Sequence, residues 1–233
     1  MFEDTIPAPT PGFMPISTAA KRLAVTEGRV RQLIKSGVLR ASQVGDIWLV
    51  DRDSVERRMA LGPGGGRKLT PPRAWALLYL ADDQKAPWLD KSARYRVSTL
   101  LAERGLRALT SRLVDRGLPL PLRCHPSLLR QLRDDPRLML TGATAAADLD
   151  LGLLTGDMVE AYVDDGSLEK IRLEYHLQSS REPNVVLRPV RRFASAWPIA
   201  HYAPLPAIVL DLLEDLDPRT RQLGESLLDR LSR

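Results

Sequence analysis

The residues of this chain that could carry out chemistry are few and scattered. The chain holds three histidines, His125, His176 and His201, and one cysteine, Cys124. No two histidines have the spacing of a metal site, and the adjacent Cys124 and His125 supply only two of the four ligands that structural zinc takes. The sequence also lacks a Gly-x-Ser-x-Gly segment, the turn that carries the nucleophile of many hydrolases. It therefore predicts no catalytic residues, no metal and no cofactor.

Paired carboxylates are the other group with catalytic potential. Asp82-Asp83, Asp134-Asp135 and Asp164-Asp165 each lie beside a glycine, a proline or an expected helix end. Aspartate is favoured at such positions because its side chain hydrogen-bonds to nearby backbone groups. We interpret these pairs as turns and caps, and the chain as a protein that is not an enzyme. A nuclease built from dispersed acidic residues is the alternative.

Positive charge is the stronger signal. The chain has 233 residues, a formal net charge of +5 and a pI near 9.6. Residues 17–60 hold nine cations and five anions, and residues 91–137 hold eleven cations and four anions. The last 29 residues hold four cations and six anions. This asymmetry predicts two basic faces and an acidic C-terminal segment, and basic faces favour a nucleic-acid partner.

The first basic region contains a helix with two different faces. Val30, Leu33 and Ile34 recur at helical spacing and predict a buried stripe. Thr26 precedes the helix as its expected N-cap, and Gly37 follows it as its expected stop. The remaining positions are polar or charged, and we predict that they contact DNA together with Thr26: Glu27, Arg29, Arg31, Gln32 and Lys35.

The neighbouring segments predict how this helix is held. Ser17 is the expected N-cap of a preceding short helix. Residues 39–50 read as a hairpin with its turn at residues 44–46, and we expect Trp48 to lie in the core. Arg40, Ser42 and Gln43 are the predicted contacts of this hairpin with DNA. Asp53 has capping-box spacing and predicts a closing helix through Ala60.

This order of elements resembles a known family. Residues 16–60, from ISTAAKRLAVT through RVRQLIKSGVL to VGDIWLVDRDSVE, are similar to the excisionase or MerR-like winged helix-turn-helix domain. The resemblance implies that the second helix enters the major groove of double-stranded DNA. Asp46 departs from the pattern, because many relatives carry a basic residue in this turn. An excisionase-like architectural recombination factor and a protein-interaction module that does not bind DNA are the alternatives.

The rest of the chain predicts a larger mixed domain. We expect a disordered N-terminus (1–14), the winged helix-turn-helix domain (15–61), a Gly-rich linker (62–68) and an α+β domain (69–233). Within the last, the expected parts are helices over 69–135, a mostly antiparallel sheet of about four strands over 137–192 and C-terminal helices over 205–232. Its expected strands are residues 137–142, 158–163, 171–177 and 184–190.

A second set of arginines falls on two helices that we expect to break near Gly105. They could form another surface for nucleic acid, since phosphate contacts need only positioned cations. The alternative, which we slightly favour, is a solvated pair of arginine-rich helices. The set comprises Arg94, Arg96, Arg104, Arg107, Arg112 and Arg116.

The end of the chain carries a fainter resemblance. The segment APLPAIVLDLLEDLDPRTRQLGESLL, preceded by NVVLRPV, is similar to the C-terminal part of AbiEi-type antitoxins and regulators of actinobacteria. The resemblance implies a repressor of its own operon whose second domain binds a cognate toxin protein. Because a single helix-turn-helix reads few base pairs, we also expect a homodimer.

Composition predicts where the protein works. A single cysteine excludes a disulfide within the chain, which fits a reducing cytosol. No apolar run reaches the roughly 18–20 residues of a membrane helix, and the acidic, proline-rich N-terminal residues do not resemble a signal peptide. We therefore expect a cytoplasmic, nucleoid-associated protein with no membrane partner.

Overall fold

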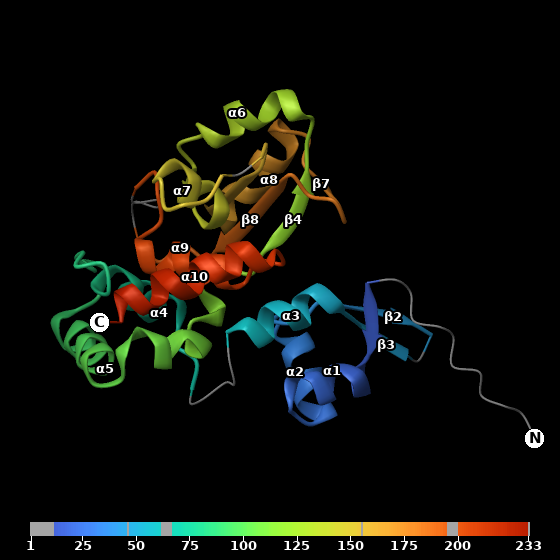
Figure 1. Cartoon of the computed structure of the whole chain (residues 1–233), viewed down its shortest axis with the longest axis horizontal. Coiled ribbons are helices and arrows are strands. Elements are labelled where there is room, and N and C mark those ends of the chain that lie inside the picture. Colours follow the sequence, from blue (N-terminus) through green and yellow to red (C-terminus); the bar gives the residue numbers. More distant parts are fainter. Residues whose placement is uncertain (1–11, 46, 62–66, 155, 195–199, 233) are drawn as a thin grey trace, which may run out of the picture. The chain divides into compact units, whose positions relative to one another are not determined.

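The structure is a computed structural model that describes residues 12–232 except 46, 62–66, 155 and 195–199. The fold is mixed α+β, and the chain divides into two compact units, residues 1–63 and 64–233 (Figure 1). Most of the expected Gly-rich linker lies outside the described residues.

The small unit alternates strands and short helices. Three antiparallel strands form its sheet in the order β1-β3-β2, and the helices pack beside them. Its elements are β1 (Phe13–Pro15), α1 (Ile16–Leu23), α2 (Glu27–Lys35), β2 (Ala41–Val44), β3 (Ile47–Asp51) and α3 (Arg52–Ala60).

The first strand corrects the expectation of a disordered segment through residue 14. Phe13 pairs with Asp51 and Met14 pairs with Val50, so β1 lies along β3. Met14 is almost fully buried in the core of the small unit. The same strand explains why Ser17 is not the N-cap of α1. The chain leaves β1 directly into the helix, which begins at Ile16 after Pro15 and has no side-chain cap.

A short turn joins α1 to α2. Ala24 adopts a left-handed conformation with φ 52°, and its N–H donates back to the carbonyl oxygens of Ala20 and Lys21, which ends α1. Thr26 then caps α2 as predicted, because its hydroxyl oxygen accepts a hydrogen bond from the Arg29 N–H at 3.2 Å. After α2, Gly37 takes φ 74°, and the N–H of Val38 donates to the Leu33 carbonyl.

The closing helix α3 begins earlier than expected. Its N-cap is Asp51, whose Oδ1 accepts from the Ser54 N–H at 2.7 Å, so the prediction of Asp53 as the cap is wrong. The Ser54 hydroxyl donates to the Asp51 carbonyl oxygen and accepts from the Arg40 N–H. This buried serine therefore ties α3 to the residue that precedes β2.

The large unit surrounds one five-stranded sheet. Its strand order is β5-β6-β8-β4-β7, and all neighbours are antiparallel except β6 and β8. The prediction of a mostly antiparallel sheet is thus confirmed. The strands are β4 (Leu120–Arg123), β5 (Leu138–Leu140), β6 (Val159–Asp164), β7 (Gln178–Ser179) and β8 (Val185–Val190).

Helices fill the rest of the large unit, and helix α4 begins directly after Thr70. The prediction of a break near Gly105 is confirmed, since Gly105 takes φ 70° inside α5. The helices, with η for short 3₁₀ turns, are α4 (Pro71–Leu80), α5 (Lys91–Leu109), η1 (Thr110–Arg112), η2 (Val114–Arg116), η3 (Pro126–Leu128), α6 (Leu129–Arg133), α7 (Gly142–Asp148), α8 (Asp165–Glu174), α9 (Leu205–Leu213) and α10 (Pro218–Leu231).

Two segments differ from the predicted secondary structure. The expected strand at 171–177 is wrong, because α8 extends to Glu174. In a strand, Ile171 and Leu173 would share a face, yet Ile171 is fully buried and Leu173 is exposed. Helix α8 lies in the crossover connection that the parallel strands β6 and β8 need, and such connections are usually helical. In addition, β4 lies within the expected helical region 69–135 and pairs with β8.

Packing of α9 on α10 completes the large core. A Cβ on Gly224 would lie 3.0 Å from the Leu213 backbone nitrogen, so the glycine allows the two helices to approach closely. Asp217 caps α10 by accepting from the Thr220 N–H. Within the described part of the chain, no helix combines the length and apolar character needed to cross a bilayer.

Candidate nucleic-acid interface

Helix α2 separates its apolar and polar side chains by face. Val30 and Leu33 are buried in the small core, and Ile34 packs against them while partly exposed. The polar residues predicted to contact DNA are all exposed: Thr26, Glu27, Arg29, Arg31, Gln32 and Lys35. The helix thus presents a continuous polar surface backed by a rigid core.

Surface contacts orient these side chains without neutralising them. Arg29 Nη1 donates to Gln32 Oε1 at 3.0 Å, and Arg31 Nη2 lies 3.5 Å from Glu27 Oε2. Exposed pairs of this kind contribute roughly 0.3–0.5 kcal/mol, so a phosphate or a base edge can compete for each guanidinium. Thr26 differs, because its hydroxyl oxygen already caps the helix.

The hairpin residues predicted to contact DNA have two environments. Ser42 and Gln43 are exposed on β2. Arg40 is half-buried, and its Nη2 lies 3.3 Å from Asp51 Oδ2. This ion pair fixes the Arg40 guanidinium at the base of the hairpin, beside the start of α3.

The outer part of the hairpin is apolar and exposed, which corrects the placement of Trp48 in the core. Trp48 is 37% exposed, Val44 60% and Ile47 44%. Val50, two residues farther along the same face of β3, is fully buried in the core of the small unit. The hairpin therefore extends beyond the helices that cover its base. Asp46 lies outside the described residues.

The second basic region is not a continuous surface of free arginines. Arg107 contacts two acids of α10, with Nη1 3.0 Å from Glu225 Oε2 and Nη2 2.7 Å from Asp229 Oδ1. Arg94 donates to the Leu89 carbonyl, and Arg112 donates to the Arg67 carbonyl. Arg116 is fully buried, whereas Arg96 and Arg104 are exposed on α5.

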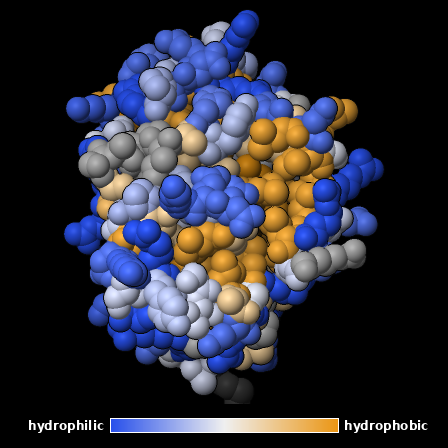
Figure 2. All heavy atoms as spheres, turned by 90° about the vertical axis from the view of Figure 1, so that its left-hand side faces the viewer, coloured by the Kyte–Doolittle hydropathy of each residue, from blue (hydrophilic) through white to orange (hydrophobic). Residues whose placement is uncertain are grey.

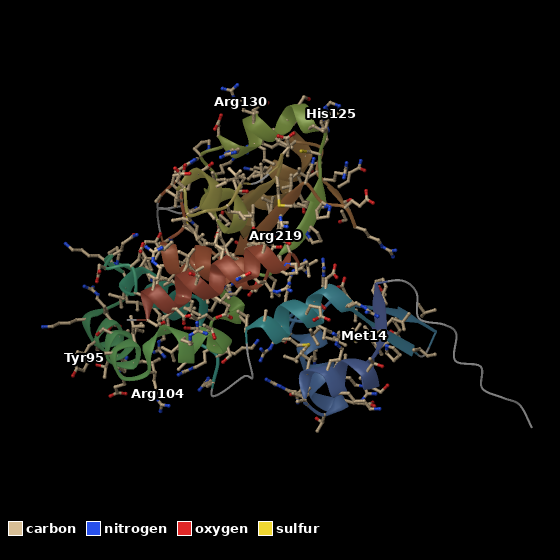
Figure 3. The ribbon with its side chains drawn as sticks, in the orientation of Figure 1. Met14, Tyr95, Arg104, His125, Arg130 and Arg219 are labelled. Carbon is tan, nitrogen blue, oxygen red and sulfur yellow. The ribbon has the colours of Figure 1, made fainter. Side chains whose placement is uncertain are left out.

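The exposed side chains of α5 include an aromatic ring. Figure 3 shows Tyr95 and Arg104 on the outer side of α5. Neither Arg96 nor Arg104 makes an ion pair with any residue that the structure describes. From the predicted second face, Arg94, Arg96 and Arg104 remain exposed beside Tyr95 without an ion pair to any described residue.

The residues considered for catalysis are held by structural contacts. Burial raises the pKa of the Cys124 thiol, so the thiolate is disfavoured. Asn184 bridges the Cys124 backbone, accepting from its N–H and donating to its carbonyl. His125 is exposed and accepts from the Ser127 N–H through Nδ1. Over the described ranges, no three His, Cys, Asp or Glu side chains are grouped as metal ligands.

Sequence reasoning missed a cluster of buried charges in the large unit. Five side chains that are almost completely buried join η2, β6, β8 and α9: Arg116, Glu160, Arg188, Asp211 and Glu214. The signal in the sequence was a charge within an apolar run, as in VEAYVD, VVLRPV and IVLDLLEDL. Nothing in the spacing indicated that these runs meet.

In comparisons with known proteins, no protein-family model, no curated protein and no solved structure matches the chain.

Proposed function

We propose that the protein is a sequence-specific regulator of transcription that binds double-stranded DNA through its small unit, a winged helix-turn-helix domain. The observation that carries this proposal is the exposed face of α2. Arg29, Arg31 and Lys35 place three cations on one nine-residue helix, and Gln32 lies among them.

The geometry of α2 suits the major groove. That groove admits a single α-helix, and arginine and glutamine can make bidentate hydrogen bonds to guanine and adenine edges. Arg29 and Gln32 already lie within hydrogen-bonding distance of each other, so they can read neighbouring bases. Lys35, at the last turn of α2, supplies a phosphate contact that orients the helix.

The hairpin adds contacts along β2. Ser42 and Gln43 are short or uncharged side chains that can donate to phosphate oxygens. Arg40 positions the hairpin through Asp51. The apolar outer part, Val44 and Ile47, suits contact with a protein surface better than with phosphate.

A homodimer extends this proposal. Two copies of α2 could grip two half-sites one helical turn apart. Strand β2 is an edge strand whose four residues, Ala41–Val44, are all uncharged. Edge strands usually carry charge or proline that blocks pairing with another chain, and β2 carries neither, which supports self-association at the hairpin.

The large unit is proposed to bind a partner protein, in the manner of an antitoxin that represses its own operon. Figure 2 shows a face of this unit where apolar side chains form a broad area bordered by hydrophilic ones. Large exposed apolar areas mark protein interaction sites. Among the described residues of this unit, Leu154 is 99% exposed and Leu173 is 75% exposed.

Selection of bound duplexes from random sequence, followed by titration at several salt concentrations, tests the DNA proposal. We expect a defined site and an affinity that falls steeply with salt. The double substitution Arg29→Ala and Arg31→Ala should reduce affinity at least tenfold, whereas Arg130→Ala on α6 should leave it unchanged. Equal affinity of the double variant would refute the role of α2.

Co-expression tests the partner proposal separately. The product of a neighbouring gene should inhibit growth alone and should be neutralised by this chain, including by the variant that lacks Arg29 and Arg31. A chain that binds DNA but neutralises no neighbour would be a simple repressor. Bending of DNA at a recombination site would favour the architectural alternative.

A further inference from the structure

The buried charges of the large unit form one continuous network. The side chains of Arg116 and Asp211 have no exposed surface, and the most exposed member, Glu214, reaches only 7%. Water therefore cannot stabilise these charges, and each must find its partners within the protein.

Asp211 and Glu214 are each supported by both arginines. Asp211 Oδ1 lies 2.6 Å from Arg116 Nη2 and 3.2 Å from Arg188 Nη1. Its Oδ2 accepts from the Thr141 hydroxyl at 2.6 Å. Glu214 Oε1 contacts Arg116 at 2.7 Å, and its Oε2 contacts Arg188 at 2.8 Å.

Glu160 contacts one of the two arginines, and its hydrogen bonds are longer than those of Glu214. Its Oε1 lies 3.1 Å from Nη2 of Arg188 and 3.2 Å from Nε of the same side chain. Its Oε2 accepts only a long hydrogen bond, 3.3 Å, from the Ala143 N–H at the start of α7. The backbone of Gly142 lies against the same oxygen, because a Cβ there would be 1.9 Å from it.

The network holds three carboxyl groups and two guanidinium groups. A proton on one carboxyl makes the buried cluster neutral, and Glu160 is the carboxyl that contacts one guanidinium group, whereas Asp211 and Glu214 each contact two. Burial raises the pKa of Glu160 to about 7; Arg188 opposes this, whereas Asp211 and Asp215 add to it.

The charged and titratable groups near the Glu160 carboxyl come from several elements. Arg188 contacts it from β8, and Arg116 of η2 and Tyr162 of β6 belong to the same network. From α9 and the residues that follow, it is faced by Asp211, Glu214 and Asp215. Helix α7 contributes the Ala143 N–H, and its one charged residue, Asp148, lies at its far end.

We propose that a proton on Glu160 holds α7 against β6, and that loss of this proton as pH rises through neutrality loosens α7, so the large unit contains a pH-sensitive switch. Ionised Oε2 would be a buried negative charge against the Gly142 backbone with one long hydrogen bond. Movement of α7 or entry of water relieves that charge. Helix α7 leads into the exposed Leu149 and Leu154, so the switch acts on an apolar surface segment.

The direction of the pH effect follows from the raised pKa. The folded unit binds this proton more tightly than the unfolded chain does, so its stabilising effect is complete below the unfolded pKa of a glutamate. That effect is lost as pH rises through about 7.

Hydrogen exchange and urea unfolding of the full chain between about pH 5.5 and 8.5 test this proposal. After correction for intrinsic exchange, amides of 142–154 should exchange at least tenfold faster at the alkaline end. Glu160→Gln, a neutral side chain of the same shape, should remove this pH dependence, whereas Glu169→Gln on the surface of α8 should retain it. A wild-type protein without the pH dependence, or a Glu160→Gln variant that keeps it, would overturn the proposal.

A second measurement covers the case in which Glu160→Gln does not fold. Infrared difference spectra of the wild-type protein, taken across neutral pH, should show the carbonyl band of a buried protonated carboxyl that disappears as pH rises. If no such band titrates near neutrality, Glu160 does not hold the proton and the switch is excluded.

Discussion

Arg116 and Asp211 form a salt bridge of 2.6 Å between residues 95 positions apart in the sequence, and neither side chain has any exposed surface. Arg116 Nε also donates to the Tyr162 hydroxyl, and the Trp75 indole donates to the Arg116 carbonyl. One arginine therefore connects η2 with α4, β6 and α9.

Removal of this arginine should destabilise the large unit strongly. We expect Arg116→Met to lower the free energy of unfolding by about 3–5 kcal/mol, because Asp211 and Glu214 lose a buried partner. Urea unfolding followed by circular dichroism measures the change. Arg107→Met is the control, since Arg107 also contacts two acids but on the surface, and it should cost less than about 1 kcal/mol. Equal losses of unfolding free energy in the two variants would mean that burial of the arginine does not determine the cost of its removal.

Gly142 should tolerate no side chain. Its φ of 52° disfavours other residues, and a Cβ would overlap Glu160 Oε2. We expect Gly142→Ala to cost more than about 2 kcal/mol, as strained and overpacked positions do. Gly156→Ala meets no atom within 4 Å and should have almost no effect. The midpoints of thermal unfolding of Gly142→Ala and Gly156→Ala, compared with that of the wild-type protein, test this prediction.

The cap of α2 offers a test in the small unit. Thr26→Ala removes the hydrogen bond to the Arg29 N–H and should cost about 1 kcal/mol. Ser17→Ala, on an exposed residue inside α1, should cost almost nothing. Hydrogen exchange of the first turn of α2 reports the loss locally. If both variants behaved alike, Thr26 would not act as the cap.

The tryptophans should differ in their sensitivity to substitution. Trp48→Ala should change stability by less than about 1 kcal/mol because the ring lies on the exposed part of the hairpin. Trp75→Ala should cost about 3–5 kcal/mol, since this ring is fully buried and packs edge-on against Tyr162. Large destabilisation by Trp48→Ala would show that the Trp48 ring packs in the core.

Local signals in the sequence predicted much of the fold. Helix periodicity located α2 and its two faces, and the break at Gly105 and the cap at Thr26 follow from the chemistry of single residues. The same reasoning failed where distant segments decide the outcome. Ser17 does not cap α1 because β1 pairs with β3, and residues 171–177 are not a strand because β6 and β8 are parallel.

The candidate sites also differ in whether local sequence could predict them. The polar face of α2 could be read from spacing because all of its residues belong to one helix. The buried network could not, because Glu160, Arg188 and Asp211 meet only when three separate elements pack together. Charges inside apolar runs were visible, but their partners were not.

The pairing of β1 with β3 has a practical consequence for work on the small unit. A shortened protein that starts at Ile16 would include every residue of both helices around the turn, yet it would lack one of three strands. Met14 would no longer fill the core, and β3 would present a bare edge to other molecules. Poor solubility of such a fragment would reflect the missing strand, and a fragment that begins before Phe13 should avoid it.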